Sequence, residues 1–477
     1  YMIKTIKNYL YNSLYQVFLI IVPFITIPYV SRVLGASLIG VNSYTNTIMS
    51  YFVLIANLGV TVYGNRTIAY CRDSIGERSR KFWEIFILKF LFSCVTYLLF
   101  LGFILMYPKY TKVLLIQSIQ ILAVSIEISW LFDGMEDFKR MVIRNFMVKI
   151  ACVILIFIFV KTPDDFDKYV FITVFSSFLG NLTLWSYVKQ YVTRVSFKSL
   201  KIQSHFLPVI YLFIPQITST IFISINKLLL GNLSTMSQAG YFDNSDKIIR
   251  ILLALITAVG TVIFPKVANE HKKRNKERVT FLTQLTFDSV NIITVPIVLG
   301  IISISSTFSN IFFGPNFKGI DLVLSVLVVE LLFMGFSSVI GSQYLIATSQ
   351  SRYLSIAIFN GVIVTVLSAL LLIPHFGAIG ASMTSVIGEM TIAFFEIWFV
   401  RKQINIVTLC KDIPKYVLSG FVMFAVLFIL RTVNFNPYLK LILQIISGGS
   451  IYFAMIFLLK PKLVNLVLEK YKKYKVN

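Results

Sequence analysis

The sequence predicts an all-α polytopic membrane protein with about fourteen transmembrane helices. Of its 477 residues, 57% are hydrophobic and 14% are charged, and the mean hydropathy is +0.80. A soluble protein carries about a quarter charged residues. Apolar stretches of about 20 residues recur along the whole chain with short connections between them, and each is long enough to cross a bilayer.

The apolar windows locate the expected spans one after another. They lie at residues 10–34, 38–63, 83–106, 112–132, 142–160, 168–188, 207–231, 240–264, 281–307, 320–343, 353–373, 378–400, 414–431 and 438–459. The first window is too long for the apolar region of a signal peptide, so we expect this span to be retained. The basic segment 461–477 places apolar residues at helical spacing and is expected to form an amphipathic cytoplasmic tail or a solvated basic one.

The distribution of positive charge predicts the orientation. Most of the 44 lysines and arginines fall at the two ends of the chain and in every second connection, and the other connections hold few. Such an excess marks the cytoplasmic side, so both termini are expected in the cytoplasm. The net charge of +23 is therefore interpreted as a topology signal that also attracts anionic lipids, and not as a nucleic-acid site.

A weak internal repeat predicts two lobes. The spans at 10–34 and 207–231 each contain two prolines, and the polar segment Gly40–Ile48 resembles Gly240–Ile248. An offset of six spans makes the repeats parallel. We expect an N-terminal lobe at 1–200 (spans 1–6), a C-terminal lobe at 201–405 (spans 7–12), appended spans 13–14 at 406–460 and the tail at 461–477, with a cavity between the lobes.

The connections leave no room for a soluble enzyme domain, and no P-loop motif GxxxxGK[ST] occurs. The four cysteines and three histidines have no metal-ligand spacing, so neither a metal site nor a disulfide framework is expected. Asp164 and Asp165 offer an acidic motif of the kind that membrane glycosyltransferases use. A turn with solvated acids explains them better, and a glycosyltransferase or polymerase is the weaker alternative.

Three segments resemble Wzx/RfbX-type flippases for lipid-linked oligosaccharides, of the multidrug/oligosaccharidyl-lipid/polysaccharide exporter superfamily. They are PFITIPYVSRVLGASLIGVNSYTNTIMSYFVLIANLGVTVYGNR at 23–66, WLFDGMEDFKRMVIRN at 130–145, and IPQITSTIFISINKLLLG with GYFDNSDKI between 214 and 248. Where the family usually has an acid before the base near the end of the seventh span, this chain has Asn226 before Lys227.

The resemblance implies movement of an undecaprenyl-diphosphate-linked oligosaccharide to the outer leaflet by alternating access, for capsule, O-antigen, exopolysaccharide or teichoic acid assembly. It implies no cofactor, coupling to a proton or Na⁺ gradient, and a polymerase or ligase of the same pathway as a partner. A cation-coupled drug antiporter of the same superfamily is the main alternative. A scaffold role in polysaccharide assembly remains open as an addition.

Such a substrate calls for basic groups at depth to meet its diphosphate. Asp243, Asp246, Lys247 and Arg250 share one face of the span 240–264. Arg250 is the leading candidate for the diphosphate, and an ion pair with Asp246 or Asp243 that only fixes the helix is the competing interpretation. The further substrate-binding candidates are Lys247, Lys227 and Arg32, for which snorkelling to the interface competes, and Asn46 and Asn57 for sugar hydroxyls, for which helix packing competes.

Acids at depth are candidates for ion coupling. Glu330 and Glu389 fall near the middle of their spans, and Asp246 lies beside Arg250. A neutral, hydrogen-bonded role in helix packing competes for both glutamates. The prolines of the first and seventh spans, Pro23, Pro28, Pro208 and Pro215, are candidate hinges. Lys89 and Lys149 are interpreted as snorkelling to the cytoplasmic face.

Overall fold

The computed structural model describes residues 2–196, 198, 200–466, 468 and 469, without the side chains of 2–17, 19, 214, 215, 261 and 262. The chain forms two compact units, Tyr1–Leu228 and Leu229–Asn477. Their boundary falls near the end of one long helix, whereas the boundary expected between the lobes precedes that helix. The division into lobes and appended spans stays a prediction.

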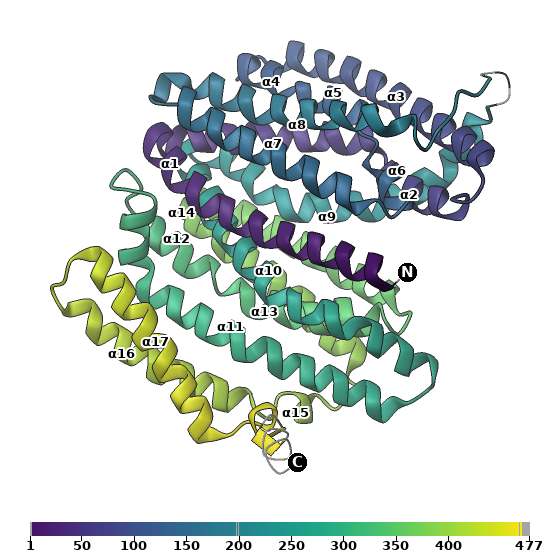
Figure 1. Cartoon of the computed structure of the whole chain (residues 1–477). Coiled ribbons are helices and arrows are strands. Elements are labelled where there is room, and N and C mark those ends of the chain that lie inside the picture. The colour runs from purple at the N-terminus through teal and green to yellow at the C-terminus, as the bar shows by residue number, and fades with distance from the viewer. Residues whose placement is uncertain (1, 197, 199, 467, 470–477) are drawn as a thin grey trace. The chain divides into compact units, whose positions relative to one another are not determined.

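The first unit consists of helices throughout its described part (Figure 1). They are α1 (Met2–Asn57), α2 (Val60–Tyr70), α3 (Ile75–Met106), α4 (Thr111–Gln117), α5 (Ile119–Ser125), α6 (Ser129–Gly134), α7 (Phe138–Phe159), the 3₁₀ turn η1 (Pro163–Asp165), α8 (Phe166–Val188), η3 (Ile202–His205) and α9 (Phe206–Leu233), which runs into the second unit.

The second unit is also helical where it is described. It contains α10 (Met236–Lys272), α11 (Lys276–Phe312), α12 (Ile320–Leu327), α13 (Glu330–Ser337), η4 (Ser338–Leu345), α14 (Ser351–Val400), α15 (Ile406–Leu409), α16 (Ile413–Thr432) and α17 (Pro437–Leu459). The segment η4 is a π-helix, a form that is rare and that recurs at functional sites.

The prediction of a polytopic all-α membrane protein is confirmed. Within the described residues, ten helices are long and apolar enough to cross a membrane, or up to 12 if two bent pairs are counted as spans. The helices α1 and α14 each cover two predicted spans. Each is interrupted by a glycine with positive φ, Gly35 (φ 73°) and Gly377 (φ 55°), within predicted connections. The count of fourteen stays a prediction.

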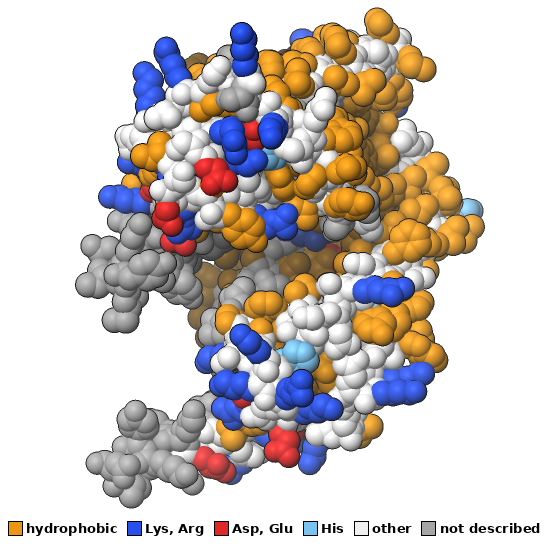
Figure 2. Space-filling model, turned by 90° about the vertical axis from the view of Figure 1, so that its right-hand side faces the viewer, with side chains coloured by type: hydrophobic (Ala, Val, Ile, Leu, Met, Phe, Trp, Pro, Cys, Tyr) orange, Lys and Arg blue, Asp and Glu red, His pale blue; other side chains and the backbone are white. Residues whose placement is uncertain are grey.

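The surface of the helices suits lipid. Large apolar side chains such as Leu98, Met147, Leu371, Ile429 and Leu458 are exposed, which water disfavours and hydrocarbon accepts. Figure 2 looks onto the helix ends beyond α2 and α6 and shows many Lys and Arg side chains there, with hydrophobic side chains along the flank. This agrees with the charge asymmetry of the connections, and which side faces the cytoplasm stays a prediction.

The first unit has its core at this basic end, around Trp130 and Phe82. The segment WLFDGMEDFKR forms α6 and the turn into α7, and α6 packs on α2. A Cβ on Gly64 would lie 2.6 Å from the ring of Trp130, so only glycine allows this approach. This segment is therefore explained by packing.

Residues after α6 tie down the connection that follows α8. Tyr191 donates to Asp137 Oδ2 (2.6 Å), and Arg140 donates to the Tyr191 hydroxyl (3.0 Å) and stacks on Tyr187. Burial and the carboxylate of Asp137 raise the pKa of Tyr191 to about 12. The Tyr191 hydroxyl therefore remains a donor at physiological pH, and its hydrogen bond to Asp137 holds the connection after α8 against the turn between α6 and α7.

The start of the tail after Pro461 packs on other helices of the second unit. The Lys462 backbone N–H donates to Asp412 (2.7 Å), and its ammonium donates to Gln284 (2.8 Å). Val464 is buried in a core that also contains Tyr416. Val467 and residues 470–477 of the expected amphipathic tail lie outside the described residues.

Candidate functional site

Four charged residues of α10 form two ion pairs along one helical face. Lys247 Nζ lies 2.6 Å from Asp243 Oδ2, and Arg250 Nε lies 3.0 Å from Asp246 Oδ1. The spacing of four residues brings each pair together on adjacent turns. Both carboxylates are buried, with 7% of each side chain exposed, whereas Lys247 and Arg250 expose 39% and 36%. The bases are therefore the accessible members of the two pairs.

Two further acids from other helices lie within electrostatic range of Arg250. Glu330 begins α13, just after the break that follows α12, and Glu389 lies within α14. Both are nearly fully buried, at 2% and 6% exposed. We call Asp246, Arg250, Glu330 and Glu389 the Arg250 cluster. If its three acids are all ionised, the cluster carries two more negative than positive charges.

The polar groups of the Arg250 cluster are incompletely satisfied. Glu330 Oε1 is buried and has no hydrogen-bond partner among the described residues. A buried carboxylate oxygen without a donor is costly, and a bound proton or cation removes much of that cost. The structure thus brings together the three residues that the sequence nominated for ion coupling with Arg250, the leading candidate for the diphosphate.

A fourth buried acid, Glu396, was missed by the sequence reasoning. It is fully buried on α14, accepts a hydrogen bond from Ser337 Oγ (2.9 Å), and lies within electrostatic range of Glu389. Its other oxygen has no partner among the described residues. The signal was available, because Glu389 and Glu396 are seven residues apart and share one face of a helix.

The π-helix η4 lies beside this acidic face. A Cβ on Gly341 of η4 would lie 2.2 Å from Glu396 Oε1, so the glycine lets the backbone reach the carboxylate. Gln343 of η4 covers Gly260 of α10, where a Cβ would lie 1.5 Å from Gln343 Nε2. The segments Met236–Gly260 and Ile263–Lys272 meet there at 40°. Gln343 thus packs against the bend of α10.

The candidate substrate-binding residues of the first unit lie on α1 and near the end of α9. Asn46 is exposed and accepts a hydrogen bond from Gln120 Nε2 (3.0 Å). Asn57, at the end of α1, accepts from Thr61 Oγ1 (3.1 Å) of α2, which gives it a local role at the turn between the helices. Arg32 is exposed on α1, and Lys227 is half-buried near the end of α9 beside the buried Asn226.

Lys89 does not snorkel. It is fully buried on α3, and its Nζ lies 2.5 Å from Glu127 Oε2 and donates to the Glu127 carbonyl oxygen at 3.0 Å. The interpretation as an interfacial lysine is wrong because Glu127, 38 residues away in the chain, supplies a buried counter-ion that the sequence pattern does not reveal. Buried ion pairs of this kind need both partners.

The candidate hinge prolines occupy different settings. Pro23 and Pro28 lie inside α1 and leave it helical, because the non-helical angles in α1 fall at Gly35. Pro208 lies in the first turn of α9, where a proline removes no intrahelical hydrogen bond. The segments Ile202–Phe213 and Gln216–Leu233 meet at 45°. Pro215 lies at this bend, but its side chain falls outside the described residues.

Asp165 of the acidic turn has a structural role. Its Oδ2 accepts hydrogen bonds from the backbone N–H groups of Lys161 and Thr162 (both 3.0 Å), and its Oδ1 pairs with Lys168 (2.6 Å). The carboxylate therefore caps the turn into α8, and both of its oxygens are engaged in these structural contacts.

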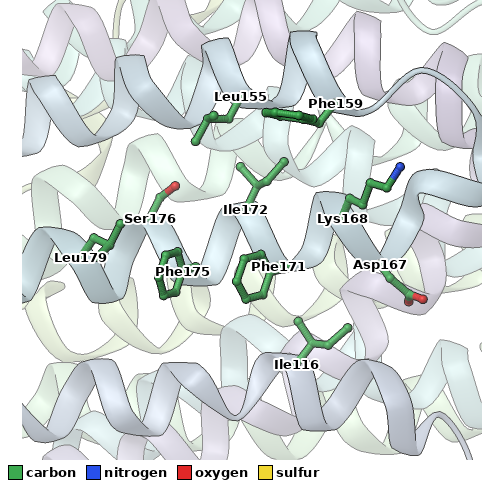
Figure 3. Close-up of a pocket in the computed structure, with 10 residues that line it drawn as sticks. All are labelled: Ile116, Leu155, Phe159, Asp167, Lys168, Phe171, Ile172, Phe175, Ser176 and Leu179. Atoms are coloured by element: carbon green, nitrogen blue, oxygen red, sulfur yellow. The ribbon is translucent and has the colours of Figure 1, made fainter.

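Each unit carries an apolar groove. In the first, a groove of about 590 Å³ runs along α8 between α7 and α4, lined by Phe171, Phe175 and Leu155, with Asp167 and Lys168 at one end (Figure 3). In the second, a groove of about 220 Å³ lies between α10, α11, α16 and α17, and Leu252 of α10 is among its lining residues. The side chains that line both grooves are mostly apolar and therefore suit contact with hydrocarbon chains.

Comparisons with known proteins connect this architecture to a family. Residues 5–271 match the family described as "Polysaccharide biosynthesis protein". A relative from Escherichia coli (strain K12), described as "Putative O-antigen transporter", is 21% identical over 402 residues, covering 83% of this chain and 97% of that protein.

Two solved structures share the fold. The lipid II flippase MurJ in an inward closed conformation aligns with a TM-score of 0.75 at 19% identity, over 96% of this chain and 100% of that chain. An inward-facing MATE family multidrug resistance transporter of the MOP superfamily aligns with a TM-score of 0.61 at 15% identity, over 82% and 96%. The chain therefore belongs to the polysaccharide biosynthesis protein family and is a multi-pass membrane protein that shares its fold with MurJ and with this transporter of the MOP superfamily.

Proposed function

We propose that the protein flips an undecaprenyl-diphosphate-linked oligosaccharide from the cytoplasmic to the outer leaflet of the bacterial cytoplasmic membrane. The product would enter assembly of a surface polysaccharide such as O-antigen, capsule, exopolysaccharide or teichoic acid. The observation that carries the proposal is the match to the polysaccharide biosynthesis family over more than half of the chain. The charge asymmetry of the connections supports an orientation with both termini in the cytoplasm.

The second unit offers complementary surfaces for the two ends of such a lipid. Arg250 is the accessible base of a largely buried cluster, and a guanidinium binds a diphosphate oxygen pair well. The groove that Leu252 helps to line offers apolar surface on another face of the same helix, where part of a prenyl chain can lie. One helix, α10, thus contacts both the charged head and the hydrocarbon tail.

The ion pair with Asp246 sets a condition on this contact. Asp246 accepts from the Nε–H of Arg250, so a diphosphate that binds this edge of the guanidinium must displace Asp246. Binding of a proton or Na⁺ at Asp246, Glu330 or Glu389 reduces the surplus negative charge and releases Arg250 for the substrate. Loss of the ion restores the pair and expels the diphosphate. The gradient is thereby coupled to lipid release.

Alternating access then moves the loaded site from one side to the other. The bends in α9 and the prolines in α1 are the places where spans can flex during this motion. Anionic lipids surround the basic loops, and a polymerase or ligase that consumes the flipped lipid is the expected partner at the outer surface.

A cation-coupled drug antiporter is the second candidate, and the acid surplus of the Arg250 cluster favours it, because acids attract organic cations. The two functions respond oppositely to one change. Replacing Arg250 with Glu makes the cluster more acidic, which blocks a diphosphate and strengthens cation binding.

The test measures surface polymer in cells whose own flippase is deleted, with wild-type protein, Arg250→Glu and Arg250→Lys at equal abundance in the membrane. The proposal expects export with wild type, a loss of at least about tenfold with Arg250→Glu, and partial retention with Arg250→Lys, which keeps the charge. Export unaltered by Arg250→Glu, together with greater resistance to a cationic drug, would instead support the antiporter.

A further inference from the structure

The second half of α1 and the interrupted helix α4–α5 face each other through two amide pairs. Gln117 Nε2 donates to Asn42 Oδ1 (3.1 Å), and Gln120 Nε2 donates to Asn46 Oδ1 (3.0 Å). Asn42 and Asn46 are one helical turn apart, and so are Gln117 and Gln120 across the break at Ser118. We call these the inner rung (Asn42–Gln117) and the outer rung (Asn46–Gln120).

The two rungs differ in exposure. In the inner rung Gln117 is 1% exposed and Asn42 is partly buried, so the open edge of this rung is largely covered. Asn46 is exposed and Gln120 is half-exposed, so the outer rung is open. The inner rung is a contact between packed helices, since interhelical hydrogen bonds in membranes serve this purpose, and Gln117 Oε1 is buried there without a hydrogen-bond partner among the described residues. The outer rung holds polar groups that packing does not use.

Depth shows what the outer rung faces. Asn46 lies midway between Gly35, where α1 is interrupted, and Asn57, where it ends. At 1.5 Å rise per residue this is about 16 Å from either end, near the middle of a bilayer. Exposed amides at this depth are not tolerated against hydrocarbon and instead line a water-filled path. The rung is therefore available to a polar solute that crosses the membrane.

The hydrogen-bonding groups on the open edge of the outer rung limit the chemical class of ligand that can bind there. With one hydrogen bond between the two amides, Asn46 Nδ2 remains as a donor and Gln120 Oε1 as an acceptor. Exchanging O and N in both amides leaves one acceptor and one donor again. In either orientation, the edge presents one donor beside one acceptor. A sugar ring with two adjacent hydroxyls, or with a hydroxyl beside an acetamido group, presents the complementary pair.

We propose that Asn46 and Gln120 form a glycan-contact site, at which adjacent hydrogen-bonding groups of a sugar ring bind the open edge of the outer rung. The inference rests on the proposed function and adds the residue Gln120, which the sequence did not nominate. The site selects for the presence of sugar on the carrier lipid. The Arg250 cluster would meet the diphosphate of either lipid and would not distinguish a carrier with sugar from one without.

The test compares binding of two lipids to the full-length protein in nanodiscs. One is undecaprenyl diphosphate without sugar, and the other carries a short oligosaccharide with vicinal hydroxyls, with an acetamido sugar as a further arm. The variant Asn46→Leu/Gln120→Leu removes the outer rung while preserving its volume. Asn42→Leu/Gln117→Leu does the same to the inner rung and is the matched control.

Wild type is expected to bind the sugar-bearing lipid about tenfold more tightly than the bare lipid, the worth of one to two hydrogen bonds. The outer-rung variant should bind both lipids equally, at the wild-type affinity for the bare lipid. The inner-rung variant should keep the preference. Gln120→Asn, which shortens the side chain and stays polar, should also lose it and serves if the double variant misfolds.

The outcomes separate the two claims. If wild type binds neither lipid, the proposed function fails. If wild type binds both lipids equally, or if the outer-rung variants keep the preference, the glycan-contact site is overturned and the outer rung is packing alone, while the proposed function stands.

Discussion

The buried pair of Lys89 and Glu127 allows a prediction of magnitude. Lys89 is fully buried, and its ammonium has Glu127 Oε2 at 2.5 Å and the Glu127 carbonyl oxygen at 3.0 Å as partners. Replacing Glu127 with Ala leaves the charge with the carbonyl alone, and a broken buried pair costs about 3–5 kcal/mol. Glu127 Oε1 also accepts from the Ser129 N–H at the start of α6 (2.7 Å), whose loss adds about 1 kcal/mol.

We therefore expect Glu127→Ala to lower the free energy of unfolding by roughly 4–6 kcal/mol. Glu127→Gln keeps one acceptor oxygen, enough for one of the two donors, and should cost less than Glu127→Ala. Lys89→Met combined with Glu127→Leu removes both charges and should recover most of the loss, because an apolar pair of similar volume replaces a buried ion pair at little cost.

A surface pair supplies the control. Lys112 and Asp167 also form an ion pair, but the Lys112 side chain is 78% exposed. Asp167→Ala should cost no more than about 1 kcal/mol. The assay is reversible unfolding of the purified protein in mixed micelles by titration with a denaturing detergent, followed by tryptophan fluorescence. Equal losses for Glu127→Ala and Asp167→Ala, or a double variant as unstable as Glu127→Ala, would refute the reasoning.

Three further predictions follow from the candidate site. Glu330→Gln should abolish the dependence of lipid exchange on an ion gradient while exchange itself continues; a gradient response equal to wild type would remove Glu330 from coupling. Gly260→Ala should lower the free energy of unfolding by about 1–3 kcal/mol, because its Cβ displaces Gln343, and Gln343→Ala should restore it; no rescue would mean that the strain lies elsewhere. Replacing Pro23 and Pro28 together with Leu should slow polymer export without reducing the amount of inserted protein, and normal export at equal abundance would argue against a hinge in α1.

Local patterns predicted the elements of this protein well. Apolar windows located the helices, because a bilayer demands long apolar runs whatever the tertiary packing. The short connections after Leu34 and around Gly377 were visible as turns, and both glycines do adopt positive φ. The spacing of Asp246 and Arg250 placed both on one face of α10, where they form an ion pair.

Contacts between distant segments could not be predicted in the same way. Nothing local in the sequence shows that Glu330 and Glu389, on two other helices, lie near Arg250. The same holds for Lys89, whose buried partner Glu127 changes its interpretation altogether. Gln120 was missed because an amide at a helix break carries no signal until Asn46 is seen opposite it.

The central claim is tested most directly by leaflet exchange. The full-length protein is reconstituted in liposomes with a defined undecaprenyl-diphosphate-linked oligosaccharide, and the lipid that reaches the opposite leaflet is measured with and without proton and Na⁺ gradients. We predict exchange that requires the protein and that accelerates under one of the two gradients. Exchange no faster than in protein-free liposomes under every gradient would contradict the account.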